Sequence, residues 1–138
     1  MNILFFLTPK SEVAYIPANE SLRQAFEKLK YHGYSAVPTL TDDGKYAGTI
    51  TEGDVLRAME SMCHWTISEA EKIKLPDVKR KRNIQAVTIS TDMDDLVDVI
   101  TDQNFVPVID DQEKFIGIVT RKDVIRFYYD EYRKQVKN

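Results

Sequence analysis

The stretch Ala36-Val-Pro-Thr-Leu-Thr-Asp-Asp-Gly-Lys-Tyr-Ala-Gly-Thr-Ile-Thr-Glu-Gly-Asp-Val-Leu56 decides the fold, because the chain contains it twice. The second copy runs from Phe105 to Ile125 without a gap. Identical residues recur at one constant offset of 69 positions: Pro38 and Pro107, Asp42 and Asp111, Lys45 and Lys114, Gly48 and Gly117, Thr51 and Thr120, Asp54 and Asp123, Val55 and Val124. Such self-similarity indicates a repeated structural unit.

A helix precedes each copy. Its apolar residues keep the i, i+3, i+4, i+7 spacing of an amphipathic helix. Ser21 is placed as the N-cap, and His32-Gly33 ends the helix, since glycine readily adopts a left-handed turn. The matching apolar residues are Leu22, Ala25, Phe26 and Leu29 in the first copy and Met93, Leu96, Val97 and Ile100 in the second.

Strands complete each repeat. Short strands are expected at 13–16 and 84–89, and a hairpin with strands 35–40 and 46–50 turns at Asp42-Asp43-Gly44. A second helix begins at Thr51. The order β-α-β-β-α therefore occurs twice, which predicts an α+β fold. A repeat of roughly 50 residues buries little surface alone, so we expect the two to pack as a pseudo-two-fold pair.

The repeat also sets the expected domain boundaries. Residues 1–60 form the first repeat with a short N-terminal segment, and residues 83–138 form the second. Residues 61–82 are expected to be a linker, with a short helix at 68–73 and a break near Pro76.

Composition excludes several classes of protein. The chain has 138 residues, of which 43% are hydrophobic and 30% charged, as in ordinary globular proteins. A net charge of −3 argues against a surface built wholly for nucleic acid. The single cysteine, Cys63, cannot form an internal disulfide. The apolar stretch Met1 to Leu7 lacks a basic flank and is too short for a signal peptide, and no run approaches the ~20 apolar residues of a membrane span. We expect a cytoplasmic protein.

The repeated motif resembles a known family. The strands Tyr34-Ser-Ala-Val-Pro38 and Asn104-Phe-Val-Pro107 are each followed by Gly-x-x-Thr-x-x-Asp, at Gly48 to Asp54 and Gly117 to Asp123. With this order of strand and motif in each repeat, the chain is similar to a tandem pair of CBS domains, the Bateman module, over essentially its whole length. The resemblance implies binding of AMP, ADP, ATP, S-adenosylmethionine or a cyclic dinucleotide between the repeats. It also implies a regulatory module that catalyses nothing.

The two Thr-x-x-Asp motifs allow two interpretations. Each fits a variant of the capping box, in which the threonine satisfies a free backbone N–H and the aspartate favours the positive end of the helix. Each also fits a ligand site, because a helix N-terminus attracts phosphate and a carboxylate there accepts both hydroxyls of a ribose. Both interpretations can hold for one motif.

The resemblance assigns residues to two clefts. In the favoured cleft, Asp123 would hold the ribose and Thr120, Arg121 and Lys122 would meet phosphate, with the adenine near Ala14, Tyr34, Ser35 and Ala36. The second cleft would use Thr51, Asp54, Ile84, Ala86, Phe105 and Val106. It ranks lower, because Glu52 and Gly53 replace the two cations and Glu52 would repel phosphate.

Other features carry weaker hypotheses. The basic run Lys79-Arg80-Lys81-Arg82 is either a solvated linker, a phosphate contact for the Asp54 cleft or, least favoured, a nucleic-acid contact, since no aromatic residues are interleaved. Cys63, His64 and His32 have neither metal-ligand spacing nor an orienting partner for a nucleophile, so we expect no metal site, no catalytic cofactor and no enzyme.

Partners are predicted as follows. The last helix carries Val124, Ile125, Tyr128, Tyr129, Tyr132 and Val136, which suggests a partly exposed aromatic surface. Similar modules dimerise through the repeat helices, so we expect a homodimer. A separate regulated protein is expected, and binding to a membrane is not expected.

The preferred ligand is AMP, ADP or ATP. The alternatives are cyclic di-AMP, because small bacterial receptors of that dinucleotide are similar from Ile3 to Pro38, and a ligand-free protein-interaction module. Glu12, standing where a lysine would help to hold phosphate, disfavours cyclic di-AMP.

Overall fold

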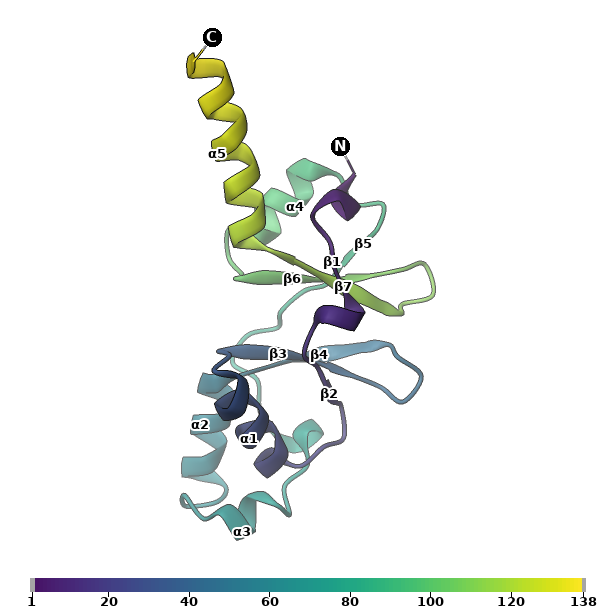
Figure 1. The fold of residues 1–138 in the computed structure, drawn as a ribbon. Coiled ribbons are helices and arrows are strands. Elements are labelled where there is room, and N and C mark those ends of the chain that lie inside the picture. The colour runs from purple at the N-terminus through teal and green to yellow at the C-terminus, as the bar shows by residue number, and fades with distance from the viewer. Residues whose placement is uncertain (1, 138) are drawn as a thin grey trace. The chain divides into compact units, whose positions relative to one another are not determined.

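The structure is a computed structural model that describes residues 2–137. The chain forms two compact units (Figure 1). The first-repeat unit spans Ala14–Ile84, and the second-repeat unit contains the residues from Gln85 onward together with the segment up to Val13. These units differ from the expected segments, because the N-terminal segment packs with the second repeat and the expected linker is part of the first-repeat unit.

The first-repeat unit begins with β2 (Ile16–Pro17), α1 (Leu22–His32), β3 (Ala36–Leu40), β4 (Tyr46–Thr51) and α2 (Glu52–Ser61). The short helix α3 (Ile67–Ala70) and a 3-10 turn (Leu75–Asp77) follow. Strand β3 is central, with β2 parallel and β4 antiparallel to it. Within this unit α1 and α2 lie on the same face of the sheet (Figure 1).

The caps of α1 match the sequence prediction. The Ser21 hydroxyl accepts the Gln24 N–H at 3.2 Å, and Gly33 is left-handed with φ 68°. The apolar stripe that these caps orient is buried: Leu22, Ala25 and Leu29 pack with Val37 and Ile50 of the sheet and with Val55 and Met59 of α2. Burial of this stripe is the main stabilising contribution to the unit.

The second-repeat unit repeats the same order. It contains β5 (Val87–Thr88), α4 (Met93–Ile100), β6 (Phe105–Ile109), β7 (Phe115–Thr120) and α5 (Arg121–Lys137). Its hairpin keeps the register of the first, including an irregularity between Val108 and Ile109 that matches the one between Thr39 and Leu40. The predicted β-α-β-β-α repeat is therefore confirmed in both units.

One strand was not predicted. The N-terminal segment forms a 3-10 turn (Ile3–Phe6), β1 (Thr8–Pro9) and a second 3-10 turn (Lys10–Glu12). Strand β1 pairs antiparallel with β7, so this sheet has four strands in the order β1-β7-β6-β5. Ile3 and Phe6 are buried in the same core as Val106, Val119 and other second-repeat residues. In the part of the chain that the structure describes, no helix has the length and apolar character needed to cross a membrane.

Candidate functional site

The first Thr-x-x-Asp motif forms a complete capping box at the start of α2. The Asp54 N–H donates to Thr51 Oγ1 at 3.1 Å, and the Thr51 N–H donates to Asp54 Oδ2 at 3.1 Å. Two backbone donors that the helix leaves open are thereby satisfied, as the capping interpretation predicts.

Asp54 has two further partners. Its Oδ1 accepts a hydrogen bond from Arg57 Nη2 at 2.5 Å and another from the Lys81 N–H at 3.1 Å. The Asp54 side chain is only 3% exposed. A carboxylate offers about four acceptor positions, and three of them are occupied here. The Asp54 carboxylate therefore has little capacity left for the hydroxyls of a ribose.

The segment that brings Lys81 to Asp54 is anchored by Arg80. The Arg80 guanidinium donates to three backbone carbonyls, those of Leu75, Val78 and Thr49, at 3.0 to 3.3 Å. Thr49 lies in β4, so Arg80 ties the chain after the 3-10 turn to the edge of the first sheet. Burial lowers the pKa of Arg80, and the nearby Asp54 carboxylate opposes that effect. Arginine remains protonated at neutral pH, so all three bonds keep a charged donor.

Tyr46 fixes the end of the same segment. Its hydroxyl donates to the Ile84 carbonyl at 3.0 Å and lies 2.7 Å from Thr49 Oγ1. Burial raises the pKa of Tyr46, so the hydroxyl keeps its proton at neutral pH. The basic run is therefore neither uniformly solvated nor wholly a phosphate contact: Arg80 is a structural residue, whereas Lys79 and Lys81 have exposed side chains.

The second motif has the same sequence and a different environment. The Asp123 N–H donates to Thr120 Oγ1 at 3.1 Å, which reproduces one half of the capping box. The Asp123 side chain is exposed, and no hydrogen bond or ion pair with another described residue reaches its carboxylate. At the N-terminus of a 17-residue helix, this carboxylate is open to an external donor.

The two cations beside Asp123 differ from each other. Arg121 Nε donates to the Ile100 carbonyl at 3.0 Å, and its Nη2 donates to the Thr101 carbonyl at 3.2 Å. Arg121 therefore caps the C-terminal end of α4, a role that the sequence analysis missed. Lys122 is exposed, and no hydrogen bond or ion pair with another of residues 2–137 involves its ammonium group, so this cation is available to an anion.

Four residues of the favoured cleft lie in the first-repeat unit. Ala14 precedes β2, while Tyr34, Ser35 and Ala36 lead into and begin β3. The Ser35 carbonyl accepts the Glu52 N–H at 2.8 Å, and the Tyr34 ring stacks on His32 with centroids 5.1 Å apart. The structure thus brings Tyr34, Ser35 and Ala36 next to the start of α2, whereas Thr120 and Asp123 belong to the other unit.

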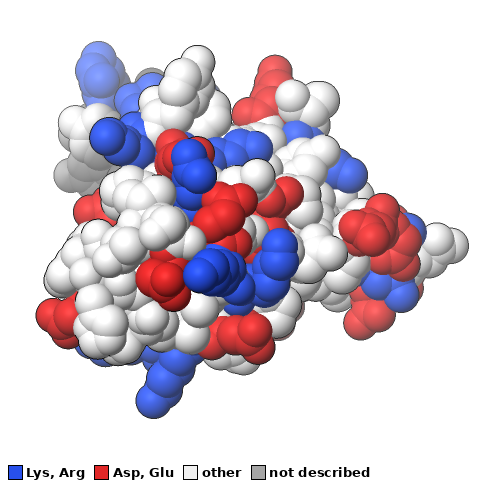
Figure 2. Space-filling model, turned by 90° about the horizontal axis from the view of Figure 1, so that it is seen from below, with Lys and Arg blue, Asp and Glu red and all other residues white. Residues whose placement is uncertain are grey.

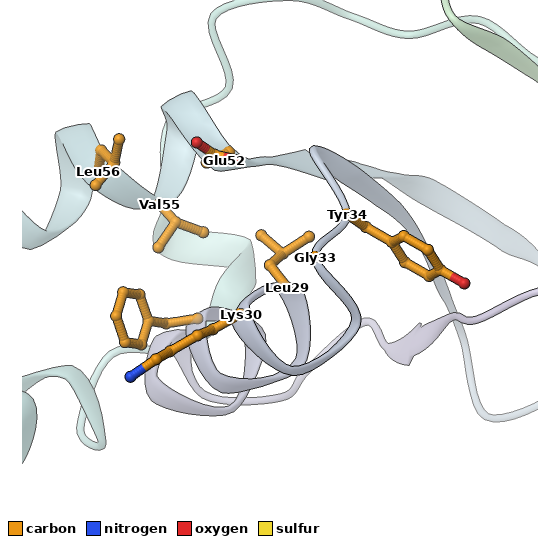
Figure 3. Close-up of a pocket in the computed structure, with 8 residues that line it drawn as sticks. Leu29, Lys30, Gly33, Tyr34, Glu52, Val55 and Leu56 are labelled. Atoms are coloured by element: carbon orange, nitrogen blue, oxygen red, sulfur yellow. The ribbon is translucent and has the colours of Figure 1, made fainter.

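A pocket of about 270 Å³ opens beside Tyr34, between α1 and α2 (Figure 3). Its wall is mostly apolar, with Leu29 and Val55 inside it and Lys30 and Glu52 among its charged residues. The Tyr34 ring extends away from Val55 and Leu56 in this view (Figure 3). Glu52 occupies the position that corresponds to Arg121 in the second repeat.

The residues expected in the second cleft are divided between the units. Thr51, Asp54 and Ile84 lie in the first-repeat unit, while Ala86, Phe105 and Val106 lie in the other. Val106 is fully buried in the core of its unit. Because Asp54 and the Ile84 carbonyl are already hydrogen-bonded internally, we rank this cleft below the Asp123 site, as the sequence did for a different reason.

Candidate metal ligands and the charge distribution of the surface concern the weaker hypotheses from the sequence. Residues 2–137 hold no group of three or more side chains placed to bind a metal ion. Cys63 is buried, and this burial raises the pKa of its thiol. On the face seen in Figure 2, basic side chains lie beside acidic ones. Among the described residues, Arg23 and Glu27 form one exposed ion pair at 2.9 Å.

The sequence matches the CBS domain family twice, over residues 6–61 and 77–130. A 17.7 kDa protein of Acidianus ambivalens is 26% identical over 91% of this chain and 73% of its own length. Among solved structures, CbpB in complex with c-di-AMP is 25% identical, with a TM-score of 0.86 over 99% of this chain and 90% of that one. CBSX2 in complex with AMP is 24% identical, with a TM-score of 0.73 over 99% and 98% of the two chains, and shows likeness of fold.

Proposed function

The chain belongs to the CBS domain family, and we propose that it is a regulatory module that binds an adenine nucleotide, AMP, ADP or ATP, through Asp123 and acts on a separate protein. One observation carries the proposal: the Asp123 carboxylate is exposed and unpartnered among the described residues, at the start of α5. The carboxylate of its equivalent, Asp54, already accepts three internal hydrogen bonds. We therefore expect one nucleotide for each chain.

The chemistry at the start of α5 suits a nucleotide. A carboxylate accepts hydrogen bonds from vicinal ribose hydroxyls, and charge on the acceptor strengthens them. Lys122 supplies an ammonium group and the helix N-terminus supplies a partial positive charge for phosphate. Because Arg121 is bonded to the end of α4, we assign the main phosphate contact to Lys122 and a supporting electrostatic role to Arg121.

We propose that the adenine is read by the first-repeat residues Ala14, Tyr34, Ser35 and Ala36. Alanine substitution of Tyr34 or Ser35 tests this assignment separately from Asp123. Each variant should weaken binding, and the double variant with Asp123→Ala should show coupling if both residues contact one ligand. Unchanged binding in both single variants would place Tyr34 and Ser35 outside the site.

Cyclic di-AMP is the second candidate ligand. It is favoured by the likeness to CbpB, whose structure holds c-di-AMP and whose sequence is 25% identical to this chain. Calorimetric competition between AMP and cyclic di-AMP separates the two candidates. Displacement of AMP by the dinucleotide at a tenfold lower concentration would identify cyclic di-AMP as the preferred ligand.

We further propose that the chain forms a homodimer through its repeat helices. Large apolar side chains are exposed on these helices: Tyr31 on α1, Leu56 on α2, and Ile125, Tyr129 and Tyr132 on α5. Exposed apolar side chains that gather into a patch mark protein interfaces. The regulated partner is proposed to recognise the module in its nucleotide-bound state.

A thermal-denaturation screen with AMP, ADP, ATP, S-adenosylmethionine and cyclic di-AMP tests the proposed function. A ligand that binds only the folded chain stabilises it by about 2.7 kcal/mol at one hundred times its Kd. We expect a clear upward shift in Tm with at least one adenine nucleotide. No shift with any of the five would instead favour a ligand-free protein-interaction module.

A further inference from the structure

A cavity of about 330 Å³ lies against α5 in the second-repeat unit. Its wall combines the N-terminal residues Phe5 and Thr8 with Asp123, Arg126, Phe127 and Asp130 of α5. It is a shallow depression that is open to solvent on one side. The carboxylate that we assign to ribose is thus part of a cavity formed within a single unit.

Phe5 is the exposed aromatic residue of this wall. Its side chain is 68% exposed, although its neighbour Phe6 is buried. Edge-to-face contacts hold the Phe5 ring, with centroid distances of 5.2 Å to Phe6 and 5.6 Å to Phe127. Such contacts favour particular ring orientations, so two aromatic neighbours support one side of the Phe5 ring and the rest of the ring is exposed.

The segment that carries Phe5 is anchored to the sheet. Thr8 and Pro9 pair with Ile118 and Gly117 of β7. The approach is so close that a Cβ at Gly117 would lie 2.2 Å from the Thr8 carbonyl oxygen. The aromatic wall is therefore held by a strand pairing whose close fit depends on glycine.

The corresponding place in the first-repeat unit has a different chemistry. There a cavity of about 440 Å³ is lined by Arg57, Ser61, Lys79 and Lys81, among others, and by no aromatic residue. Its aspartate, Asp54, is buried. Of these two cavities, only the one beside Asp123 combines an exposed carboxylate with aromatic side chains.

We propose that Phe5 is a base-binding residue of the nucleotide site, where its ring stacks against the adenine while Asp123 holds the ribose. The inference rests on the proposed function and extends it, because it adds an aromatic residue of the same unit to the ribose contact at Asp123. Stacking on an aromatic side chain suits any purine base. Arg126 is exposed and lines the same site, beside the carboxylates of Asp123 and Asp130.

Calorimetry with AMP and with cyclic di-AMP tests the proposal in Phe5→Ala, Phe5→Tyr and the control Leu4→Ala. Leu4 is also exposed on the same turn but does not line the cavity. Phe5→Ala should weaken binding about tenfold, the usual order for losing one base–aromatic stack. Phe5→Tyr, which keeps the ring, and Leu4→Ala should bind as the unaltered chain does. The Tm of each variant without nucleotide shows whether the fold is retained.

A fluorescence measurement reports on stacking directly. Trp65 is the only tryptophan, so Phe5→Trp in a Trp65→Phe background carries one emitting ring, at the proposed wall. Adenine nucleotide should quench this emission at concentrations that match the calorimetric Kd. Lost binding in Asp123→Ala with unchanged binding in Phe5→Ala would overturn the role of Phe5 and leave the proposed function intact. Absence of nucleotide binding by the unaltered chain would overturn both.

Discussion

Asp54 and Asp123 occupy equivalent positions in the two repeats, yet their carboxylates have different environments. Asp54 is 2% exposed and accepts hydrogen bonds from Thr51, Arg57 and Lys81. Asp123 is exposed and has no such partner among the described residues. The same motif therefore serves as a structural cap in one repeat and as an open acceptor in the other.

The isosteric variants Asp54→Asn and Asp123→Asn should separate these roles. Asp54→Asn places an amide where a buried carboxylate accepts from two backbone N–H groups and an arginine, so we expect a loss of about 2 kcal/mol in the free energy of unfolding. Asp123→Asn should change that free energy by no more than about 0.5 kcal/mol. Urea denaturation measures both. Equal destabilisation by the two variants would contradict the division of roles.

The sequence predicted part of this difference. The capping geometry at both threonines follows from the Thr-x-x-Asp spacing alone, and Arg57 was detectable as a cation three residues after Asp54 on the same helix. The bond from the Lys81 N–H could not be predicted, because it is a backbone contact across 27 positions. The same limit applies to Arg121, whose bonds to the end of α4 depend on how two helices meet.

At the scale of elements, the segment 79–81, which follows the 3-10 turn, is held against β4 and α2 by hydrogen bonds. Its central residue is Arg80, which binds three carbonyls, while the neighbouring Lys79 is exposed. The sequence analysis considered the basic run as a whole, because four adjacent cations give no sign of which one is half-buried and hydrogen-bonded to backbone carbonyls.

Arg80→Ala should therefore lower the free energy of unfolding by about 2 kcal/mol, since it leaves buried carbonyls without a donor. Lys79→Ala serves as the matched control and should have an effect within about 0.5 kcal/mol. Hydrogen exchange provides a local readout: the Lys81 amide should lose protection in Arg80→Ala. Retained protection at Lys81 would show that the attachment of this segment to β4 does not depend on Arg80.

The pairing of β1 with β7 was also beyond the sequence. Helices α1 and α2 and the two hairpins were predicted because their signals are local, in apolar spacing, caps and turns. Strand β1 has only two residues, Thr8 and Pro9, and its partner lies more than 100 positions away. Gly117 and Gly48 are equivalent in the two repeats, but no other segment approaches Gly48. The shared glycine therefore did not indicate that β1 packs closely against Gly117.

Gly117→Ala should detach β1. The added methyl would overlap the Thr8 carbonyl, whereas Gly48→Ala meets nothing within 4 Å, and both glycines have positive φ. Alanine is strained at both positions, with φ 120° at Gly48 and 155° at Gly117, but only at Gly117 does the methyl group also meet a docked strand. We expect Gly117→Ala to be less stable than Gly48→Ala by about 2 kcal/mol. Faster hydrogen exchange along β1 and β7 should accompany this loss, and unchanged exchange there would contradict the account.

At the scale of the whole molecule, the exposed apolar side chains of the repeat helices predict a dimer. Light scattering should give twice the chain mass of 16.0 kDa at micromolar concentration. Leu56→Asp should shift the equilibrium toward monomer, because it places a charge on an apolar helix face. Ile67→Asp is the control, since Ile67 is comparably exposed but lies on α3. A monomeric unaltered chain would refute the proposed dimer.

The division into units also belongs to this scale. The repeat predicted two similar halves, and the structure shows that the N-terminal segment packs with the second half. That exchange comes from burial of Ile3 and Phe6 against second-repeat residues, which no local pattern reveals. It places Phe5 and Asp123 in one unit, on which the proposed base-binding wall depends.

Nucleotide calorimetry on the unaltered chain, Asp123→Asn and Asp54→Asn tests the divergence of the two aspartates most directly. We predict one bound nucleotide per chain, at least tenfold weaker binding in Asp123→Asn, and binding within about twofold of the unaltered chain in Asp54→Asn once its folded fraction is taken into account. Lost affinity in Asp54→Asn together with unchanged affinity in Asp123→Asn would contradict the account.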